Sequence, residues 1–156
     1  MAFEQLKLEN QLCFPVYAAS RLIIREYQPF LDKLEITYPQ YLVLLVLWEQ
    51  DSLTVNEISQ KLILNTNTVT PLLKRMESQG IISRNREGSD ERKVIVRLTE
   101  KGRQMQAEAA KIPEQLGAEI ASEAMSIKEL LDLKEKLYTI INYLNKKSNG
   151  DTENPL

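Results

Sequence analysis

The strongest nucleophile that this sequence offers is Cys13, its only cysteine among 156 residues. There is no histidine, which excludes Ser-His and Cys-His catalytic pairs and every histidine-based metal site. A single thiol can form neither an intramolecular disulfide nor a zinc cluster of thiolates. Most enzyme constellations are therefore absent, and we expect no catalysis, no metal and no cofactor.

Cys13 has two interpretations. Free cysteine is among the most buried residue types, so it can be a small apolar core residue. Pro15 instead places it at or next to the start of a helix, where the positive end of the helix dipole favours a thiolate. Tyr17 shares its helix face four residues on, and Tyr27 and Tyr38 are further phenols that can donate to a thiolate.

The elements that must position these residues are mostly helical. Apolar periodicity predicts helices over 13–34 and about 39–50, separated by residues 36–39. Thr54 and Glu57 form a capping-box pattern that starts a short helix ending near Leu64. A further helix covers about 67–79, although Pro71 requires either a late start or a bend, and Gly80 is a natural stop.

After Gly80 the period of the apolar pattern changes. Residues 81–86 and 94–98 have strand character with turn residues at 87–90 between them, which predicts a β-hairpin. Thr99 then caps a new helix, Pro113 opens or bends another, and Ser126 with Glu129 begins the last. An apolar stripe from Ile127 to Leu144 follows.

The charge is unevenly distributed. Residues 74–103 carry nine basic and five acidic side chains, a balance of +4, whereas the whole chain has −2. Such a segment is often only a solvated face, but a basic centre in an acidic frame also suits phosphates.

Two helices followed by a basic hairpin predict a winged helix-turn-helix, with the 67–79 helix reading base edges and the hairpin reaching a groove. The alternative is a helical protein with an incidental hairpin. The residues that we expect to contact DNA are Thr66, Asn67, Thr68, Thr70, Lys74, Arg75, Arg84, Arg86, Asp90, Arg92 and Lys93.

The hairpin and the residues that follow it resemble a known family. Residues 88–94, Gly-Ser-Asp-Glu-Arg-Lys-Val, leading to Leu-Thr-Glu-Lys-Gly at 98–102, resemble the wing signature of the MarR family of bacterial transcription regulators. Residues 68–77 look like that family's recognition helix, and the resemblance covers 6–147. It implies a homodimer whose terminal helices pair and whose winged domains read a palindromic operator. Arg92 would enter the minor groove, and Asp90 would help to hold the wing.

The N-terminal residues narrow the resemblance. Leu-Glu-Asn-Gln-Leu-Cys-Phe at 8–14, with Tyr17, Tyr27 and residues 36–41, is similar to the organic hydroperoxide resistance (OhrR) branch, of the one-cysteine type. The resemblance implies that Cys13 is a peroxide sensor surrounded by tyrosines, whose oxidation releases a repressor from DNA. The chain departs from the branch at Asn65-Thr66-Asn67, where Asp-Ser-Gly is usual, and at Pro15.

Helix geometry adds a constraint. Tyr27 follows Cys13 by 14 residues, or ~21 Å along a straight helix, so a contact between them would have to come from another subunit. Without a second cysteine, oxidised Cys13 would form a mixed disulfide with a small thiol, form a sulfenamide, or over-oxidise.

Three functions are compatible with these residues: a peroxide-sensing repressor, a MarR-type regulator of a small aromatic ligand with Cys13 structural, and a cysteine peroxidase. The first is favoured. We expect a mainly α protein with a small β-hairpin wing, of the α+β class. Its predicted parts are a helical dimerisation region (1–38 and 104–147), a winged helix-turn-helix domain (39–103) and a flexible tail (148–156). With no apolar run long enough to span a bilayer and no signal peptide, a cytoplasmic location without membrane contact is expected.

Overall fold

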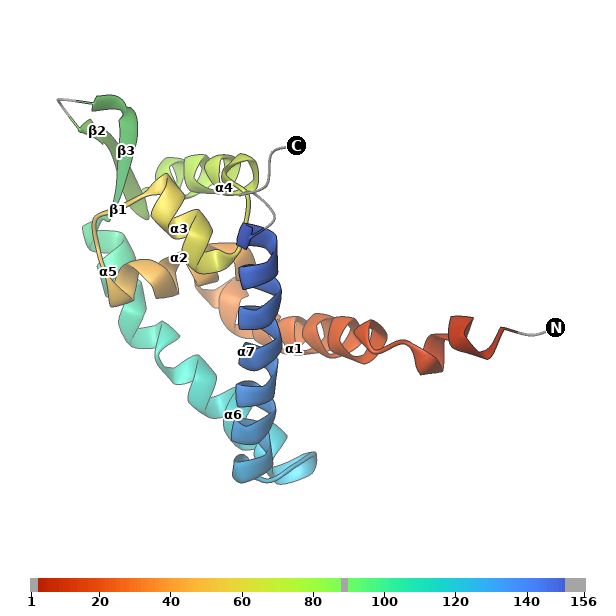
Figure 1. Ribbon diagram of the computed structural model, residues 1–156. Helices are drawn as coiled ribbons and strands as arrows, with labels where there is room; N and C mark the ends of the chain where they lie inside the picture. The colour runs from red at the N-terminus through yellow and green to blue at the C-terminus, as the bar shows by residue number, and fades with distance from the viewer. Residues whose placement is uncertain (1–2, 88–89, 151–156) are drawn as a thin grey trace, which may run out of the picture. The chain divides into compact units, whose positions relative to one another are not determined.

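The computed structural model describes the backbone of residues 3–87 and 90–150, and the side chains of 3–86 and 93–148 (Figure 1). The chain divides into two compact units, Met1–Ile112 and Pro113–Leu156. The helices and strands, in order, are η1 (Glu4–Leu6), η2 (Leu8–Asn10), α1 (Cys13–Lys33), α2 (Tyr38–Glu49), β1 (Leu53–Thr54), α3 (Val55–Leu62), α4 (Thr66–Ser78), β2 (Ile82–Glu87), β3 (Asp90–Leu98), α5 (Glu100–Ala109), α6 (Lys111–Glu123) and α7 (Ile127–Gly150).

The core of the first unit forms around α2. This helix is apolar around most of its circumference, which is typical of a helix enclosed by others. Tyr41, Leu44 and Leu47 are almost fully buried. The end of α1 contributes Leu31 to this core. The neighbouring elements contribute Ile58 of α3, Val69, Leu73 and Met76 of α4, and Ile82, Ile95 and Val96 of the hairpin. The winged portion is thus one packed body.

The three strands form an antiparallel sheet in the order β1-β3-β2. The hairpin register places Ile82 opposite Leu98 and Arg84 opposite Val96. Figure 1 shows β2 and β3 projecting away from the helices of their unit. The sequence predicted this hairpin but not β1, a two-residue strand directly before the capping box of α3.

The predicted helix starts are confirmed by their caps. Thr54 Oγ1 accepts from the Glu57 N–H at 3.1 Å, and the Glu57 carboxylate accepts from the Thr54 N–H at 2.7 Å. Ser126 and Glu129 make the same reciprocal pair. Thr99 Oγ1 accepts from the Gly102 N–H and so starts α5.

Helix α4, the recognition-helix candidate, does not start late to accommodate Pro71. Asn65 is its N-cap, and the helix continues from Thr66 through Pro71. Pro71 lacks the N–H that would reach the Asn67 carbonyl four residues back. The helix ends as predicted at Gly80, whose φ of +69° suits a glycine C-terminal stop.

The C-terminal unit contains most of α6 and all of α7. The prediction of a flexible tail from residue 148 is wrong for 148–150, which continue α7. Basic residues at 146 and 147 suit the last turn of a helix, where they face the negative end of the dipole, and Gly150 is the last helical residue. Residues 151–156 lie outside the described part of the chain.

No helix among the described residues has the length and apolar character needed to cross a membrane.

Two glycines give a matched test of this packing. A Cβ on Gly102 would clash with the Ile81 carbonyl oxygen, which is already fixed by the Thr99 N–H and hydroxyl. A Cβ on Gly117, inside α6, would meet nothing within 4 Å. We expect Gly102→Ala to destabilise the protein by about 1–3 kcal/mol, and Gly117→Ala to stabilise it by about 0.5–1 kcal/mol. Urea unfolding of both variants measures the difference, and equal effects would contradict the close approach of α5 to the Ile81 carbonyl.

Candidate functional site

One face of α4 is available to solvent. Val69, Leu73 and Met76 are buried, which fixes the orientation of the helix on the core. On the other side the exposed residues are Thr66, Asn67, Thr68, Lys74 and Arg75, while Thr70 is half-buried. Every α4 residue predicted from the sequence to contact DNA therefore lies outside the core.

Thr70 differs from its neighbours because its hydroxyl donates to the Thr66 carbonyl at 2.8 Å. This bond occupies the proton of the hydroxyl and leaves its oxygen as an acceptor. The side chains of Thr66, Asn67 and Thr68 surround the first turn of α4. The Thr68 N–H donates to the Asn65 carbonyl, and the positive end of the helix dipole at this turn attracts anions.

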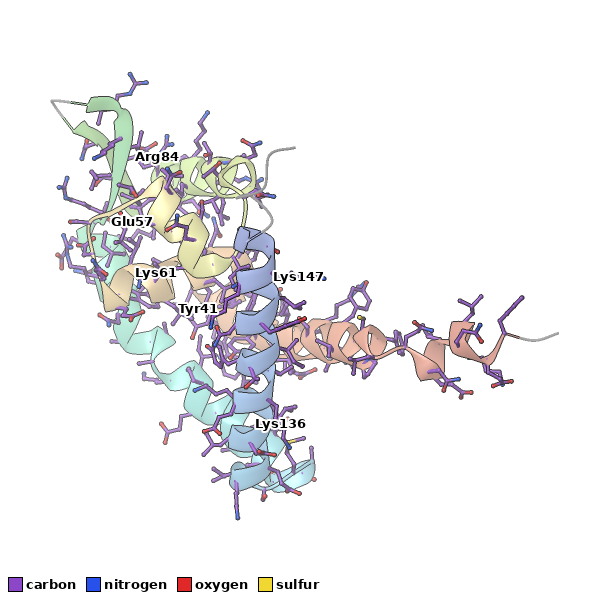
Figure 2. The ribbon with its side chains drawn as sticks, viewed as in Figure 1. Tyr41, Glu57, Lys61, Arg84, Lys136 and Lys147 are labelled. Atoms are coloured by element: carbon purple, nitrogen blue, oxygen red, sulfur yellow. The ribbon has the colours of Figure 1, made fainter. Side chains whose placement is uncertain are left out.

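The hairpin adds cations beside α4. Arg86 and Lys93 are exposed, while the side chains of Asp90 and Arg92 lie outside the described residues, so their predicted roles stay predictions. Lys93 and Lys61 also help to lower the pKa of Glu57, although hydrogen bonds from the Thr54 hydroxyl and backbone are the larger cause. Figure 2 shows Glu57 and Lys61 together on α3.

Arg84 has a different environment from the one expected. Its Nε and Nη2 donate to Glu77 Oε2 at 3.0 and 2.7 Å, and its backbone N–H donates to Glu77 Oε1 at 3.2 Å. The guanidinium side chain is only 19% exposed. These contacts join β2 to the last turns of α4, near the Arg84 label in Figure 2, and the predicted DNA contact of Arg84 stays a prediction.

Cys13 is the first residue of α1 and is exposed. The preceding residue, Leu12, provides no side-chain cap, and Pro15 occupies the first turn. The predicted position at a helix start is confirmed, and the interpretation as a core residue is wrong for the single chain. The positive end of the α1 dipole lies at this turn and favours a thiolate, although Pro15 has no N–H and the Phe14 N–H donates to the Gln11 carbonyl.

Three tyrosines meet where α1 approaches the start of α2. The ring centroids of Tyr27 and Tyr38 are 5.2 Å apart in an edge-on arrangement, and Tyr41 lies 5.8 Å from Tyr27 and 6.3 Å from Tyr38. Figure 2 labels Tyr41 at this junction. We call Tyr27, Tyr38 and Tyr41 the tyrosine cluster.

Burial raises the pKa of each phenol in the tyrosine cluster, for Tyr41 to about 12. The charge of a neighbouring phenolate raises the pKa of Tyr27 and Tyr41 further. All three hydroxyls are thus protonated at neutral pH and remain available as hydrogen-bond donors.

The structure does not bring Cys13 to this cluster. Helix α1 is continuous from Cys13 to Lys33, so Tyr27 lies ~21 Å along the axis from Cys13 in the same chain. Tyr17, the remaining predicted partner, is exposed and accepts a hydrogen bond from Arg21 Nη1 at 2.9 Å. The predicted thiol site is therefore split within one chain.

Sequence reasoning missed Tyr41 and Glu77 as members of these sites. Tyr41 follows Tyr38 by three residues, a helical spacing that places both on one face and could have identified it. Glu77 gave no such signal, because its pairing with Arg84 depends on the fold of the hairpin against α4.

Nowhere in the ranges that the structure describes do three metal-binding side chains gather into a candidate metal site.

Comparisons with known proteins agree on one family. Residues 25–109 match the family described as "Transcriptional regulator SarA/Rot". The chain is 48% identical over 146 residues to an organic hydroperoxide resistance transcriptional regulator of Bacillus subtilis (strain 168), covering 94% of this chain and 97% of that protein.

Solved structures of AbfR, a Staphylococcus epidermidis protein, have the same fold. Reduced AbfR bound to DNA is 40% identical with a TM-score of 0.75, covering 92% of this chain and 99% of that one. Overoxidised AbfR bound to DNA is 38% identical with a TM-score of 0.71, covering 90% and 97%.

These relatives are named as regulators and not as enzymes, which sets the peroxidase interpretation aside. A mainly helical fold with a small antiparallel sheet, as predicted, is confirmed by the same structures. The chain belongs to the MarR and SarA/Rot family of winged helix-turn-helix transcriptional regulators, and within it to the organic hydroperoxide resistance branch.

Proposed function

We propose that this protein is a transcriptional repressor that binds a palindromic operator as a homodimer and is released when an organic hydroperoxide oxidises Cys13. The observation that carries the proposal is an exposed thiol at the first residue of α1, in a chain whose α4 presents a polar face to solvent. As a regulator of transcription it would act in the cytoplasm, where the bacterial chromosome lies.

The DNA surface would consist of the exposed face of α4 and the hairpin. Thr66, Asn67 and Thr68 would contact base edges in the major groove, and Lys74 and Arg75 would bind phosphates. At the hairpin, Arg86, Arg92 and Lys93 would supply cations to the adjacent groove, with Asp90 holding the wing. Support comes from AbfR, which shares the fold and is bound to DNA in both the reduced and the overoxidised structure.

Dimerisation is supported by apolar side chains that the chain leaves exposed. None of the described side chains of α7 is buried, and Ile127 is 67% exposed. Further large exposed residues in α7 and the N-terminal segment are Leu131, Tyr138, Ile140, Ile141 and Leu144, and Leu6, Leu8, Leu12, Phe14, Val16, Leu22 and Ile23. Apolar surface of this extent marks an interface, and a two-fold pair buries both sets at once.

A dimer would also complete the thiol site. Since Cys13 and Tyr27 are held apart by a continuous helix, the tyrosine cluster could reach Cys13 only from the partner subunit. Protonated phenols beside the thiolate would stabilise the negative charge that makes it reactive.

The sensing chemistry follows from the thiolate. Its sulfur attacks the terminal oxygen of the hydroperoxide, the O–O bond breaks, and the alkoxide leaves as an alcohol after taking a proton. Cys13 becomes a sulfenic acid, a two-electron oxidation. A small thiol then attacks the sulfenic sulfur and displaces water, forming a mixed disulfide.

The mixed disulfide is the form that we expect to release DNA. AbfR has been crystallised on DNA in an overoxidised state, so added oxygen atoms alone are compatible with DNA in that relative. A disulfide adduct adds many more atoms at a close-packed interface, which must shift to accommodate them. Such a shift would change the spacing of the two winged units and their fit to the half-sites.

The DNA surface predicts a salt effect. Lys74→Ala should weaken binding to all duplexes and reduce the slope of log affinity against log salt by about 0.9 per subunit, because one phosphate contact is lost. Lys111→Ala removes an exposed lysine of α6 that pairs with Glu108, and it should change neither the affinity nor the salt slope. Fluorescence anisotropy at several salt concentrations measures both variants, and identical slopes would remove α4 from the DNA surface.

The interface predicts a change of oligomeric state. Ile141→Glu should weaken the dimer at least about tenfold, because it buries an unpaired charge on association. Thr139→Glu adds the same charge two residues away on roughly the opposite side of α7, and should leave a dimer. Sedimentation at micromolar concentration distinguishes them, and a monomeric wild type would refute the homodimer.

The thiol predicts a loss of sensing alone. Cys13→Ser keeps the size of the side chain but cannot form a sulfenic acid, so it should bind operator normally and stay bound after organic hydroperoxide and a small thiol are added. Wild type should be released under the same conditions, most completely with the thiol present. Gel shifts of both proteins test this. Should both respond alike, Cys13 is not the sensor and regulation by a small aromatic ligand takes its place, for which release by a salicylate-like compound is the assay.

A further inference from the structure

A chain of three hydrogen bonds connects the α1–α2 turn with the C-terminal end of α4. The Thr37 N–H donates to Gln40 Oε1 at 2.9 Å, and Gln40 Nε2 donates to Gln79 Oε1 at 2.7 Å. Gln79 Nε2 then donates to the Glu35 carbonyl oxygen at 3.3 Å. We call Gln40 and Gln79 the amide bridge.

The orientation of both amides is fixed by backbone groups at the two ends of the bridge. A backbone N–H can only donate, so Gln40 must turn its oxygen toward Thr37 and its NH₂ toward Gln79. The Glu35 carbonyl can only accept, which requires the same orientation of Gln79. Both requirements agree, so the bridge has a single arrangement of donors and acceptors.

Gln40 is only 4% exposed, one of two buried polar residues in the described part of the chain. Breaking the bond to Gln79 would leave its amide without a partner in the core, which is costly. The bridge therefore resists separation of α2 from α4.

Gln79 is the C-cap of α4, so the bridge acts on the end of the recognition-helix candidate. The N–H of Gln79 donates to the Arg75 carbonyl, and its own carbonyl accepts from Lys101 Nζ at 3.1 Å. The residue is thus held through its side chain by the α1–α2 turn and through its backbone by α4 and α5.

The other end of the bridge lies next to the tyrosine cluster along the chain. Gln40 stands between Tyr38 and Tyr41 in the first turn of α2, and Tyr38 packs edge-on against Tyr27 of α1. Glu35 has a φ of +56°, in the left-handed region that is unfavourable for a glutamate, so the turn is held in a defined conformation by its surroundings. A displacement of Tyr27 or Tyr38 would move the groups that anchor the bridge.

We propose that Gln40 and Gln79 are positioning residues that fix the C-terminal end of α4 and transmit displacement of the tyrosine cluster to the DNA surface. The transmission rests on the proposed function, because it takes Cys13 oxidation as the source of the displacement. The positioning of α4 does not depend on that source.

The test uses full-length protein with Gln79→Met, which keeps the length of an exposed side chain and removes both of its side-chain hydrogen bonds. Gln40→Met is the second variant. Gln104→Met is the matched control, since Gln104 Nε2 donates only to Glu100 within the same helix. Binding is measured on a duplex selected by wild type from a random-sequence pool, before and after treatment with cumene hydroperoxide and a small thiol.

We expect Gln79→Met to bind the selected duplex about tenfold more weakly than wild type when reduced, and to show a smaller ratio of oxidised to reduced dissociation constant. Gln104→Met should match wild type in both. A Gln79→Met protein with wild-type affinity and ratio would overturn the proposal, even if its melting temperature fell, because the bridge would then serve stability alone.

Hydrogen exchange provides a readout that needs neither DNA nor oxidant. The amides of residues 79–82 should exchange faster in Gln79→Met than in Gln104→Met, and unchanged exchange would overturn the positioning of α4. If wild type binds DNA but ignores hydroperoxide, the proposed function and the transmission fail, while the DNA affinity of the reduced variants still tests the positioning of α4. If wild type binds no DNA, the hydrogen exchange of the variants tests that positioning.

Discussion

The burial of α2 on nearly all sides is the constraint on which the rest of the winged unit depends. Tyr41, Leu44 and Leu47 exclude water only if several other elements cover this helix together. Removing that much apolar surface from water is favourable by about 1.5–3 kcal/mol per large side chain. Because α4 is one of the covering elements, packing of α2 determines which face of α4 remains exposed. The polar face that suits DNA is therefore a consequence of the core.

The N-terminal segment and α7 follow a different rule. Their large apolar side chains remain in water in the single chain, Leu12 being 78% exposed. In the proposed homodimer these apolar faces would be covered by the partner, which would link folding to association. Cys13 would then lie where a small chemical change acts on a large interface.

The elements that could be predicted from the sequence are those encoded by neighbours along the chain. The capping boxes at Thr54 and Ser126 and the glycine stop at Gly80 act over a few residues, and the helix boundaries fell within one or two positions. Strand β3 instead begins at Asp90, four residues before the predicted start, and Glu87 pairs with Asp90 where a turn was expected. Strand β1 was missed because two residues cannot display a period. The tail was misjudged at residues 148–150, where polar composition concealed the last turn of α7.

The site shows the same division. The exposed residues of α4 followed from helical period, and Cys13 at a helix start followed from Pro15. The pairing of Arg84 with Glu77 was not foreseen, because Glu77 lies on another element and no local pattern reveals the pair. The contact of Tyr41 with Tyr27 on α1 and the bond from Gln40 to Gln79, 39 residues apart, likewise depend on tertiary packing, although the spacing of Tyr41 from Tyr38 is a local signal.

These non-local contacts share one location, and this bears on how a signal could travel. Within the first unit, hydrogen bonds join the turn at Glu35 to the end of α4, and the first turn of α2 carries both the bridge residue Gln40 and the cluster residues Tyr38 and Tyr41. A densely packed interior transmits small displacements because it has no free volume to absorb them. Hydrogen bonds with a fixed direction impose a further condition: the groups that they join must move together, or the bonds must break. The α1–α2 turn is therefore the place where an event at the N-terminal helix and the orientation of α4 have to be compatible.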